Sequence, residues 1–379
     1  MALPDPPWVC DGAAGAGREL ESIVRILQIA PPWFPVPPTG YGGTEQIVGL
    51  LADGLVERGH EVTLVAAGGS SSRARLRTTF TTPPTTKLGN AAIELTHAVA
   101  AYRGANGFDV VHDHTVAGAA VGAFAGQAPV VHTVHGPWTP DVSALYAQIH
   151  DRVHLTAISH DHARRAPAGI RLAGVVHNGI DVAAHPFVAE PRHDLAFVGR
   201  ANPEKGPLLA IEVARRLGRH LRMAIKVNEP DEHEYFATQI APALEQADAE
   251  LVPITSHADK CQLLGEAAVV LFPITWPEPF GLVPVEANAC GTPVVAFAEG
   301  AVPEIIEHGR TGLLVSTRDL DGFVVAVERA GRLERATCRA VAEERFGAAH
   351  MVARYERLYR RVVDLPPGVI DLERESSPA

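Results

Sequence analysis

The sequence predicts an α/β protein built from two doubly wound parallel sheets that face each other across an interdomain cleft. Three observations predict this fold. Short apolar runs alternate with amphipathic stretches along the chain. The alternation breaks once, at 178–194, and then restarts in a second half of similar size. Continuous apolar runs are typical of parallel strands that helices cover on both faces.

The first half of the chain supplies the first sheet. Residues 23–30 (IVRILQIA) are expected to form its opening strand, residues 43–58 a helix and residues 60–66 the next strand. Further apolar runs predict strands at 109–112, 130–133, 154–158 and 172–176. Helical stretches fill the intervals between these strands.

Residues 178–194 are polar, carry Pro186 and Pro191 and show little periodicity. They predict a linker, which we bound at 181–193. The alternation then restarts with strands expected at 195–198, 221–227, 249–252, 268–273 and 293–296. Helices are expected between them at 207–217, 231–247 and 282–289.

Apolar residues recur at helical spacing over 348–363, and this predicts a terminal helix that Pro366 and Pro367 bring to an end. Residues 1–22 and 364–379 are expected to be a flexible lead and a flexible tail. The lead lacks the basic start and apolar core of a signal peptide. We therefore expect a cytoplasmic protein.

The composition disfavours several classes of protein. With 46% apolar and 20% charged residues, the 379-residue chain is neither wholly disordered nor fibrous. The net charge of −11 disfavours non-specific nucleic-acid binding, which depends on neutralising phosphates, but permits a small local anion site. The four cysteines form no CxxC pair, so we expect neither a structural zinc site nor a disulfide framework. Their pattern suits a reducing cytosol.

In doubly wound sheets, ligands bind beyond the carboxyl ends of the strands. Gly40, Gly42 and Gly43 follow the first strand and precede a helix, where free backbone N–H groups can meet an anion. A plain connection rich in proline and glycine is the alternative. The spacing matches neither a dinucleotide-binding motif nor a P-loop.

Four histidines follow the next strands, in VHDHT and VHTVHG. Imidazole is a common metal ligand, but histidines at strand ends also bond to backbone or to substrate. Because His135 falls in a loop, we expect it to contact substrate. We expect no metal at His112, His114, His132 or His135.

Arg200 and Lys205 lie just after the first strand of the second half, in GRANPEKG. A guanidinium fork and a compact ammonium can together neutralise a diphosphate. Two solvated surface cations are the alternative. The position at a strand end and the neighbouring Gly206 favour an anion site.

The segment WPEPFGLVPVEANACGTPVVAF gives the strongest signal. Glu278 lies in a turn rich in proline, the residues Phe280, Gly281 and Leu282 open a helix, and Glu286 lies in the first turns of that helix. Backbone amides and a positive helix end between two carboxylates suit a phosphate beside sugar hydroxyls. For Glu286, an ordinary carboxylate on a helix surface is the alternative.

Taken together, these segments resemble glycosyltransferase family 4, the retaining sugar transferases of GT-B fold. The resemblance spans most of 23–363. The segments that carry it are GYGGTE, VHDH, HTVHG, VHNGID, FVGRANPEKG, EPFGLVPVEANACGTPVVA and VPEIIEHGRTGLLV. The Glu278–Glu286 spacing corresponds to the E-x7-E motif of that family. Two segments, KVNEPDEHEYF and VPITSHADK, depart from its pattern.

The resemblance implies two Rossmann-like domains, an acceptor domain over 23–180 and a nucleotide-sugar donor domain over 194–347, with the helix 348–363 crossing back to the first. It implies that Glu278 contacts the donor sugar, that Glu286 holds the ribose hydroxyls, and that Arg200 and Lys205 hold the diphosphate. The further contacts that it implies are His135 near the donor sugar, the loop at Gly42 and Gly43 near the diphosphate, and amides of Phe280, Gly281 and Leu282.

The implied activity is the transfer of a sugar, with retention, from a nucleotide-diphosphate sugar to a hydroxyl of a sugar, lipid or small-molecule acceptor. With cations on the diphosphate, neither a metal nor another cofactor is expected. A disaccharide phosphorylase of the same fold and a non-catalytic sugar-nucleotide binding protein are the alternatives. The arginines within 71–77 and 160–165 could make weak peripheral contact with a membrane. The alternative is that these arginines lie on a solvated surface.

Overall fold

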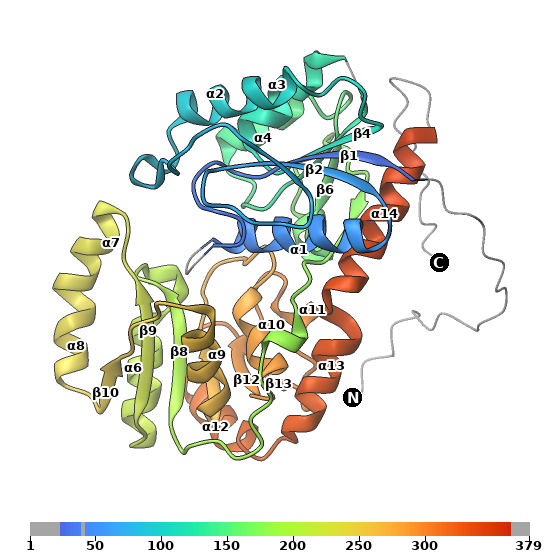
Figure 1. Cartoon of the computed structure of the whole chain (residues 1–379). Coiled ribbons are helices and arrows are strands. Elements are labelled where there is room, and N and C mark those ends of the chain that lie inside the picture. Colours follow the sequence, from blue (N-terminus) through green and yellow to red (C-terminus); the bar gives the residue numbers. More distant parts are fainter. Residues whose placement is uncertain (1–22, 39–41, 127, 365–379) are drawn as a thin grey trace, which may run out of the picture.

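The computed structural model describes residues 23–38, 42–126 and 128–364. Within them the chain forms two α/β units, each built on its own parallel sheet (Figure 1). The expected lead over 1–22, Gly40 and the expected tail beyond Asp364 lie outside the described residues.

The first unit contains a seven-stranded parallel sheet with the strand order β3-β2-β1-β4-β5-β6-β7. Its elements are β1 (Arg25–Ile29), α1 (Gly43–Glu57), β2 (Glu61–Ala66), β3 (Arg75–Thr78), α2 (Ala91–Tyr102), β4 (Val110–Asp113), α3 (Val116–Ala125), β5 (Val130–Thr133), α4 (Pro140–Ala147), β6 (His154–Ala157), α5 (His160–Arg164) and β7 (Gly174–Val175).

The second unit contains a six-stranded parallel sheet with the strand order β10-β9-β8-β11-β12-β13. Its elements are β8 (Leu195–Arg200), α6 (Pro207–Leu217), β9 (Leu221–Lys226), α7 (Pro230–Tyr235), α8 (Ala241–Glu245), β10 (Ala249–Leu251), α9 (His257–Glu266), β11 (Val269–Phe272), α10 (Leu282–Ala289), β12 (Val294–Phe297), α11 (Val302–Ile305), β13 (Gly312–Val315), α12 (Leu320–Ala330) and α13 (Arg335–Phe346). The terminal helix is α14 (Ala348–Asp364).

Helices cover both faces of each sheet, and the alternation of side chains along the strands fills a core on each face. In β1, Ile26 packs with α1 and α14, whereas Leu27 packs with the core under α2, α3 and α4. In β11, Val270 packs with α9, α10 and α13, whereas Leu271 packs with α6 and α12. This double burial explains why the strands appear in the sequence as continuous apolar runs.

Two elements differ from the sequence-based expectation. The helix expected over 231–247 is α7, a turn of π-helix over Phe236–Ile240, and α8. Pro242 accounts for the wider turn, since its nitrogen has no hydrogen to donate to the preceding turn. Residues 75–77, where the sequence analysis expected no strand, belong to the edge strand β3, which pairs with β2. Arginines on an edge strand discourage further strands from pairing with it.

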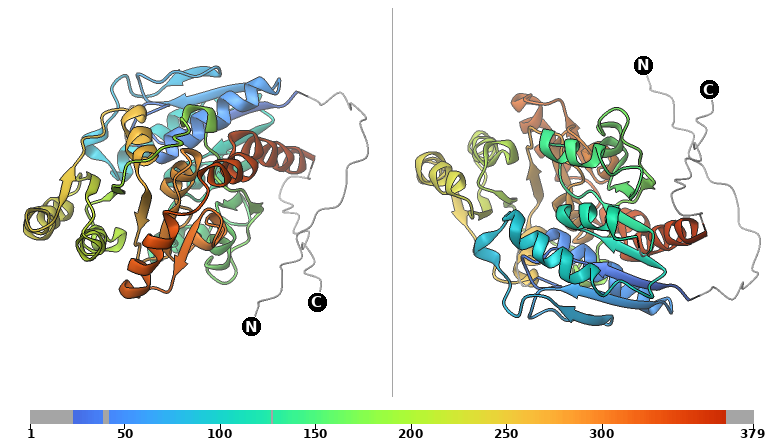
Figure 2. Two further views of the ribbon diagram at one scale, coloured as in Figure 1. Left: turned by 90° about the horizontal axis from the view of Figure 1, so that it is seen from below. Right: turned by 90° about the horizontal axis from the view of Figure 1, so that it is seen from above.

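The chain passes twice between the units, and the two passages lie side by side. The amide of Ile180 donates to the carbonyl of Phe346 at 2.8 Å, and the amide of Ala348 donates to the carbonyl of Ile180 at 2.9 Å. Beyond the second passage, α14 packs against α1 and β4 of the first unit (Figure 2). The domain bounds at 23–180 and 194–347 stay a prediction.

A buried carboxylate fastens α14 to the first unit. Glu356 is 3% exposed, and it accepts hydrogen bonds from Arg58 at the end of α1 and from Arg360 at 2.7 Å. Its Oε1 also lies 3.0 Å from Nε2 of His60, which precedes β2. This group of contacts joins the last helix to two early elements of the first sheet.

We expect the Glu356→Gln variant to lose about 2 kcal/mol of unfolding free energy, because hydrogen bonds to charged groups contribute about 1.5–3 kcal/mol. Chemical unfolding midpoints measure the loss. The matched control is Glu343→Gln, since Glu343 is 55% exposed in its ion pair with Arg339; that variant should change by less than about 1 kcal/mol. Equal midpoints for the two variants would contradict the anchoring role of Glu356.

Candidate active site

A cavity of about 830 Å³ opens between the two units. Its walls come from the segments that follow β1, β5 and β6 in the first sheet and from the ends of β8, β9 and β11 in the second. In both sheets the strand order reverses beside the first strand, between β1 and β4 and between β8 and β11. The cavity therefore lies where doubly wound sheets bind their ligands.

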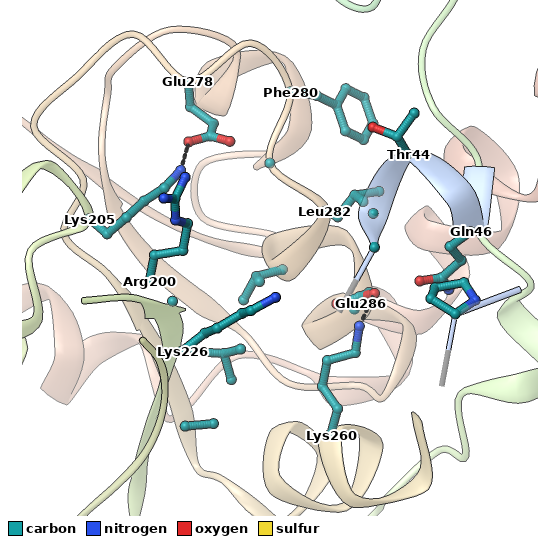
Figure 3. A pocket seen from close by; sticks show the side chains of 18 of the residues that line it. Thr44, Gln46, Arg200, Lys205, Lys226, Lys260, Glu278, Phe280, Leu282 and Glu286 are labelled. Atoms are coloured by element: carbon teal, nitrogen blue, oxygen red, sulfur yellow. Dashed lines mark hydrogen bonds and ion pairs between the residues drawn. The ribbon is translucent and has the colours of Figure 1, made fainter. Parts of the chain in front are cut away.

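An ion pair between Lys205 and Glu278 lies in the wall of this cavity (Figure 3). The same carboxylate accepts the indole N–H of Trp276 at 2.9 Å. The Lys205 ammonium lies 4.7 Å from the centroid of the Trp276 ring, within cation–π range. The side chains of Lys205 and Glu278 are 18% and 15% exposed, so both charges remain accessible to a ligand.

Two glycines let the loops that carry this ion pair approach their neighbours closely. A Cβ on Gly206 would lie 2.2 Å from the carbonyl oxygen of Pro273, and one on Gly300 would lie 2.4 Å from the amide nitrogen of Glu278. Both glycines have positive φ angles, 74° and 57°. Only glycine meets both conditions without strain.

Two helices begin at the cavity. Gly281, with φ 103°, precedes α10, and Gly42, with φ 142°, precedes α1. The two starts are neighbours, because a Cβ on Gly43 would lie 3.2 Å from Cδ1 of Leu282. Phe280 is buried beside them and lines the cavity. Helix starts leave backbone N–H groups unpaired at the positive end of the dipole, so this junction can bind an anion.

Glu286 extends from α10 into the cavity wall and is 1% exposed. Its Oε1 accepts a hydrogen bond from Lys260 of α9 at 2.6 Å. Its Oε2 is buried and has no hydrogen-bond partner within the described parts of the chain. A buried carboxylate oxygen without a donor is costly, so it suits the hydroxyl of a ligand.

Arg200 lines the cavity at the end of β8, but two carboxylates bind its guanidinium. Its Nε donates to Glu232 at 2.5 Å, and its Nη2 donates to Glu229 at 2.6 Å. The sequence pattern predicted a cation and did not reveal these acids. A phosphate at Arg200 must share the guanidinium with them, and Glu229, which is 55% exposed, is the more easily displaced.

Lys226 and Lys260 are site residues that the sequence analysis did not single out. Lys226 pairs with Arg200 in the register of β9 with β8, and its ammonium lies 5.3 Å from the ring centroid of Phe34 in the first unit. Burial, together with repulsion from Arg200, lowers the pKa of Lys226 to about 8. In the sequence, the feature that could have identified Lys226 as a site residue is its place at the end of a predicted strand.

The four histidines separate into two groups. His135 lines the cavity, with its Nε2 2.9 Å from Nδ1 of His114. Burial, with repulsion from neighbouring histidines, lowers the pKa of His135 to about 3, so its ring is neutral at pH 7. His132 bonds to the Tyr146 hydroxyl at 2.7 Å, and His112 to hydroxyls of Tyr359 and Thr133. These two histidines are core residues.

All ten predicted site residues line this same cavity. Their roles toward a ligand stay predictions. The residues are Gly42, Gly43, His135, Arg200, Lys205, Glu278, Phe280, Gly281, Leu282 and Glu286.

Two family models match adjoining parts of the chain. The model for glycosyl transferases group 1 matches residues 184–345, and the model for glycosyltransferase family 4 matches residues 41–184. Among curated proteins, the D-inositol 3-phosphate glycosyltransferase of Mycobacterium tuberculosis is 30% identical over 266 residues, which are 60% of this chain and 54% of that protein. The chain thus matches about half the length of these curated relatives.

Solved structures share the architecture. AviGT4, a glycosyltransferase involved in avilamycin A biosynthesis, is 26% identical with a TM-score of 0.68, over 90% of this chain and 98% of that one. The Anabaena protein Alr3699/HepE, solved in complex with UDP-glucose, is 17% identical with a TM-score of 0.70, over 90% of this chain and 100% of that one; this likeness concerns the fold alone. The two sheets, the cavity between them and the adjoining family matches agree, and the chain belongs to the group 1 and family 4 glycosyltransferases of GT-B fold.

Proposed function

We propose that this protein transfers a sugar, with retention of anomeric configuration, from a nucleotide-diphosphate sugar to an acceptor hydroxyl. The observation that carries the proposal is the Lys205–Glu278 pair beside the start of α10. It offers a cation and backbone amides to a diphosphate, and a carboxylate to the attached sugar. The UDP-glucose named for the Anabaena neighbour supports a nucleotide-sugar donor.

Each part of the donor has a partner in the proposed complex. Lys205 and Arg200 hold the diphosphate together with the amides at Gly281 and Leu282, while the start of α1 approaches it from the opposite wall. Glu278 accepts hydrogen bonds from the sugar hydroxyls, and its ion pair with Lys205 is partly replaced. Oε2 of Glu286, which lacks a partner among the described residues, accepts from a ribose hydroxyl.

The proposed reaction breaks the bond between the anomeric carbon and the diphosphate oxygen. The acceptor oxygen bonds to that carbon on the same face, and its proton passes to an oxygen of the departing phosphate. Negative charge gathers on the leaving group, where preorganised cations and amides are most effective. Neutral His135 can donate a hydrogen bond to the sugar. We propose that these groups neutralise the leaving diphosphate without a metal.

A second hollow, of about 340 Å³, adjoins the cavity at Pro137 and Pro279. Trp138, His162 and Arg165 line it, so it combines an aromatic face with polar groups. We propose that the acceptor, a sugar, lipid headgroup or small molecule, enters here and presents its hydroxyl to the donor.

Four of the five arginines that raised the question of membrane contact have protein partners, and Arg75 is exposed. Arg73 pairs with Glu57, Arg77 donates to backbone carbonyls, and Arg165 pairs with Asp161. In the described ranges no helix is long and apolar enough to cross a membrane. We propose a cytoplasmic location, in keeping with the free and buried thiols of Cys261, Cys290 and Cys338.

We expect the Lys205→Ala variant to lose about 10²-fold or more in turnover, as other preorganised charge contacts to a leaving group do. The assay follows nucleoside diphosphate release from UDP-, GDP-, ADP- and dTDP-sugars with candidate acceptors. Lys87→Ala, an exposed lysine outside the cavity, is the matched control and should keep full turnover.

One result of this assay would contradict the role of Lys205, and two results of separate assays would reject the proposed transfer. Turnover of Lys205→Ala within a few-fold of wild type would remove the role of that lysine. Phosphate-dependent release of a sugar phosphate from a disaccharide, without a nucleotide, would indicate a phosphorylase. Nucleotide binding without transfer or hydrolysis would indicate a binding protein.

Donor affinity should also depend on the charge of Lys226. Because its pKa is lowered to about 8, the lysine is charged at pH 7 and becomes neutral as the pH rises through that value. A charge contact at a partly solvated site contributes about 1 kcal/mol or more. We therefore expect donor-sugar affinity to fall by about fivefold or more across this range, and to stay level in Lys226→Gln. Equal pH profiles for the two proteins would exclude this contribution.

A further inference from the structure

Two histidines and a cysteine gather outside the cavity lining. His257 and Cys261 lie one turn apart on α9, and His185 follows the short 3₁₀ turn over Val182–Ala184. A potential ligand atom of each residue lies within 4.8 Å of the other two. The Cys261 sulfur is 3.2 Å from Nε2 of His257, and the two imidazole rings meet edge to face with centroids 4.6 Å apart.

The hydrogen bonding of His185 leaves one of its nitrogens available. The His185 ring is fully buried, and its Nδ1 lies 2.7 Å from the carbonyl oxygen of Asp181. A carbonyl oxygen can only accept, so Nδ1 carries the hydrogen and Nε2 carries a lone pair. This Nε2 is buried and has no hydrogen-bond partner in the described part of the chain. A carbonyl bonded to the far nitrogen is the arrangement that orients histidines toward metals.

We propose that His185, His257 and Cys261 bind a divalent transition-metal ion of the zinc class. Two imidazoles and one thiolate form a ligand set that zinc prefers, whereas magnesium and calcium require oxygen ligands. The ligand atoms lie within 4.8 Å of one another, and Nε2 of His257 would exchange its contact with the Ala184 carbonyl oxygen, at 3.2 Å, for the metal. A water supplies the fourth position, since the Cys290 thiol donates to the Cys261 carbonyl at 3.7 Å. The half-buried His257 gives a route from solvent.

The site would support the donor-binding residues without taking part in transfer. It connects the segment after Ile180 to α9, and α9 carries Lys260, the partner of Glu286. Binding would release one proton into solvent from the hydrogen-bonded pair of Cys261 and His257, leaving a thiolate and a neutral imidazole whose hydrogen is on Nδ1. The inference is independent of the proposed transferase activity, since its test measures metal binding directly.

The test uses the full chain, freed of metal with a chelator under reducing conditions. Cobalt(II) is the spectroscopic probe. We expect one equivalent to bind with a thiolate-to-cobalt charge-transfer band, and zinc to displace it. Because zinc binds the folded protein, it should also raise the thermal unfolding midpoint.

Three variants make the test specific. Cys261→Ser should abolish the charge-transfer band. Both Cys261→Ser and His257→Gln should weaken zinc binding by more than the roughly 10–100-fold that is typical when a residue hydrogen-bonded to a metal ligand is lost. Cys338→Ser removes a buried cysteine outside the cluster and should bind like wild type. Circular dichroism confirms folding, and half-buried His257 provides a second variant if Cys261→Ser does not fold.

Two results would overturn the proposal. The first is wild-type protein that binds cobalt without a thiolate band, or no more tightly than His257→Gln. The second is a thiol count of two rather than four in denatured, unreduced protein, with a Cys261–Cys290 disulfide in the peptide map. That result would show that the sulfur of Cys261 forms a disulfide in place of a metal bond.

Discussion

Parallel strand pairing brings the carboxyl ends of all strands to one edge of each sheet, and here the two edges share a cavity. The side chains of the candidate site follow one of these strands or, like Lys260 and Glu286, lie in the first turns of a helix after one. The side-by-side passages at Ile180 and Gly347 and the return of α14 hold the two edges together. Interactions far from the cavity, such as those of Glu356, thereby support its geometry.

The cavity is rich in charge, yet its charges are paired. Lys205 pairs with Glu278, Lys260 with Glu286, and Arg200 with Glu229 and Glu232. Burying a cation is costly unless an opposite charge accompanies it, and the carboxylates meet that cost when no ligand is bound. A diphosphate that replaces a carboxylate at a cation frees that carboxylate for hydroxyls. The same ion pairs can thus stabilise the cavity when no ligand is bound and supply the groups that bind a nucleotide sugar.

Much of this arrangement could be predicted from local sequence. The helices α6 and α10 begin and end at the predicted residues; Pro207 and Gly281 mark their starts, and Gly218 marks the end of α6. Contacts between distant segments were harder to predict. The acids at Arg200 lie just before and within α7, and the cluster of His185 with His257 and Cys261 joins segments far apart in the chain. Cysteine spacing alone suggested no zinc site, since two of the three ligands are histidines.

The central claim is that the cavity binds a nucleotide through its diphosphate. Calorimetric titration of the wild-type protein and Arg200→Ala with nucleosides, their monophosphates and their diphosphates tests it most directly. The account predicts measurable affinity for one nucleoside diphosphate, much weaker binding of its monophosphate and none of its nucleoside, with the diphosphate preference reduced in Arg200→Ala. Equal affinity for diphosphate and nucleoside, or binding of none of them, would contradict it.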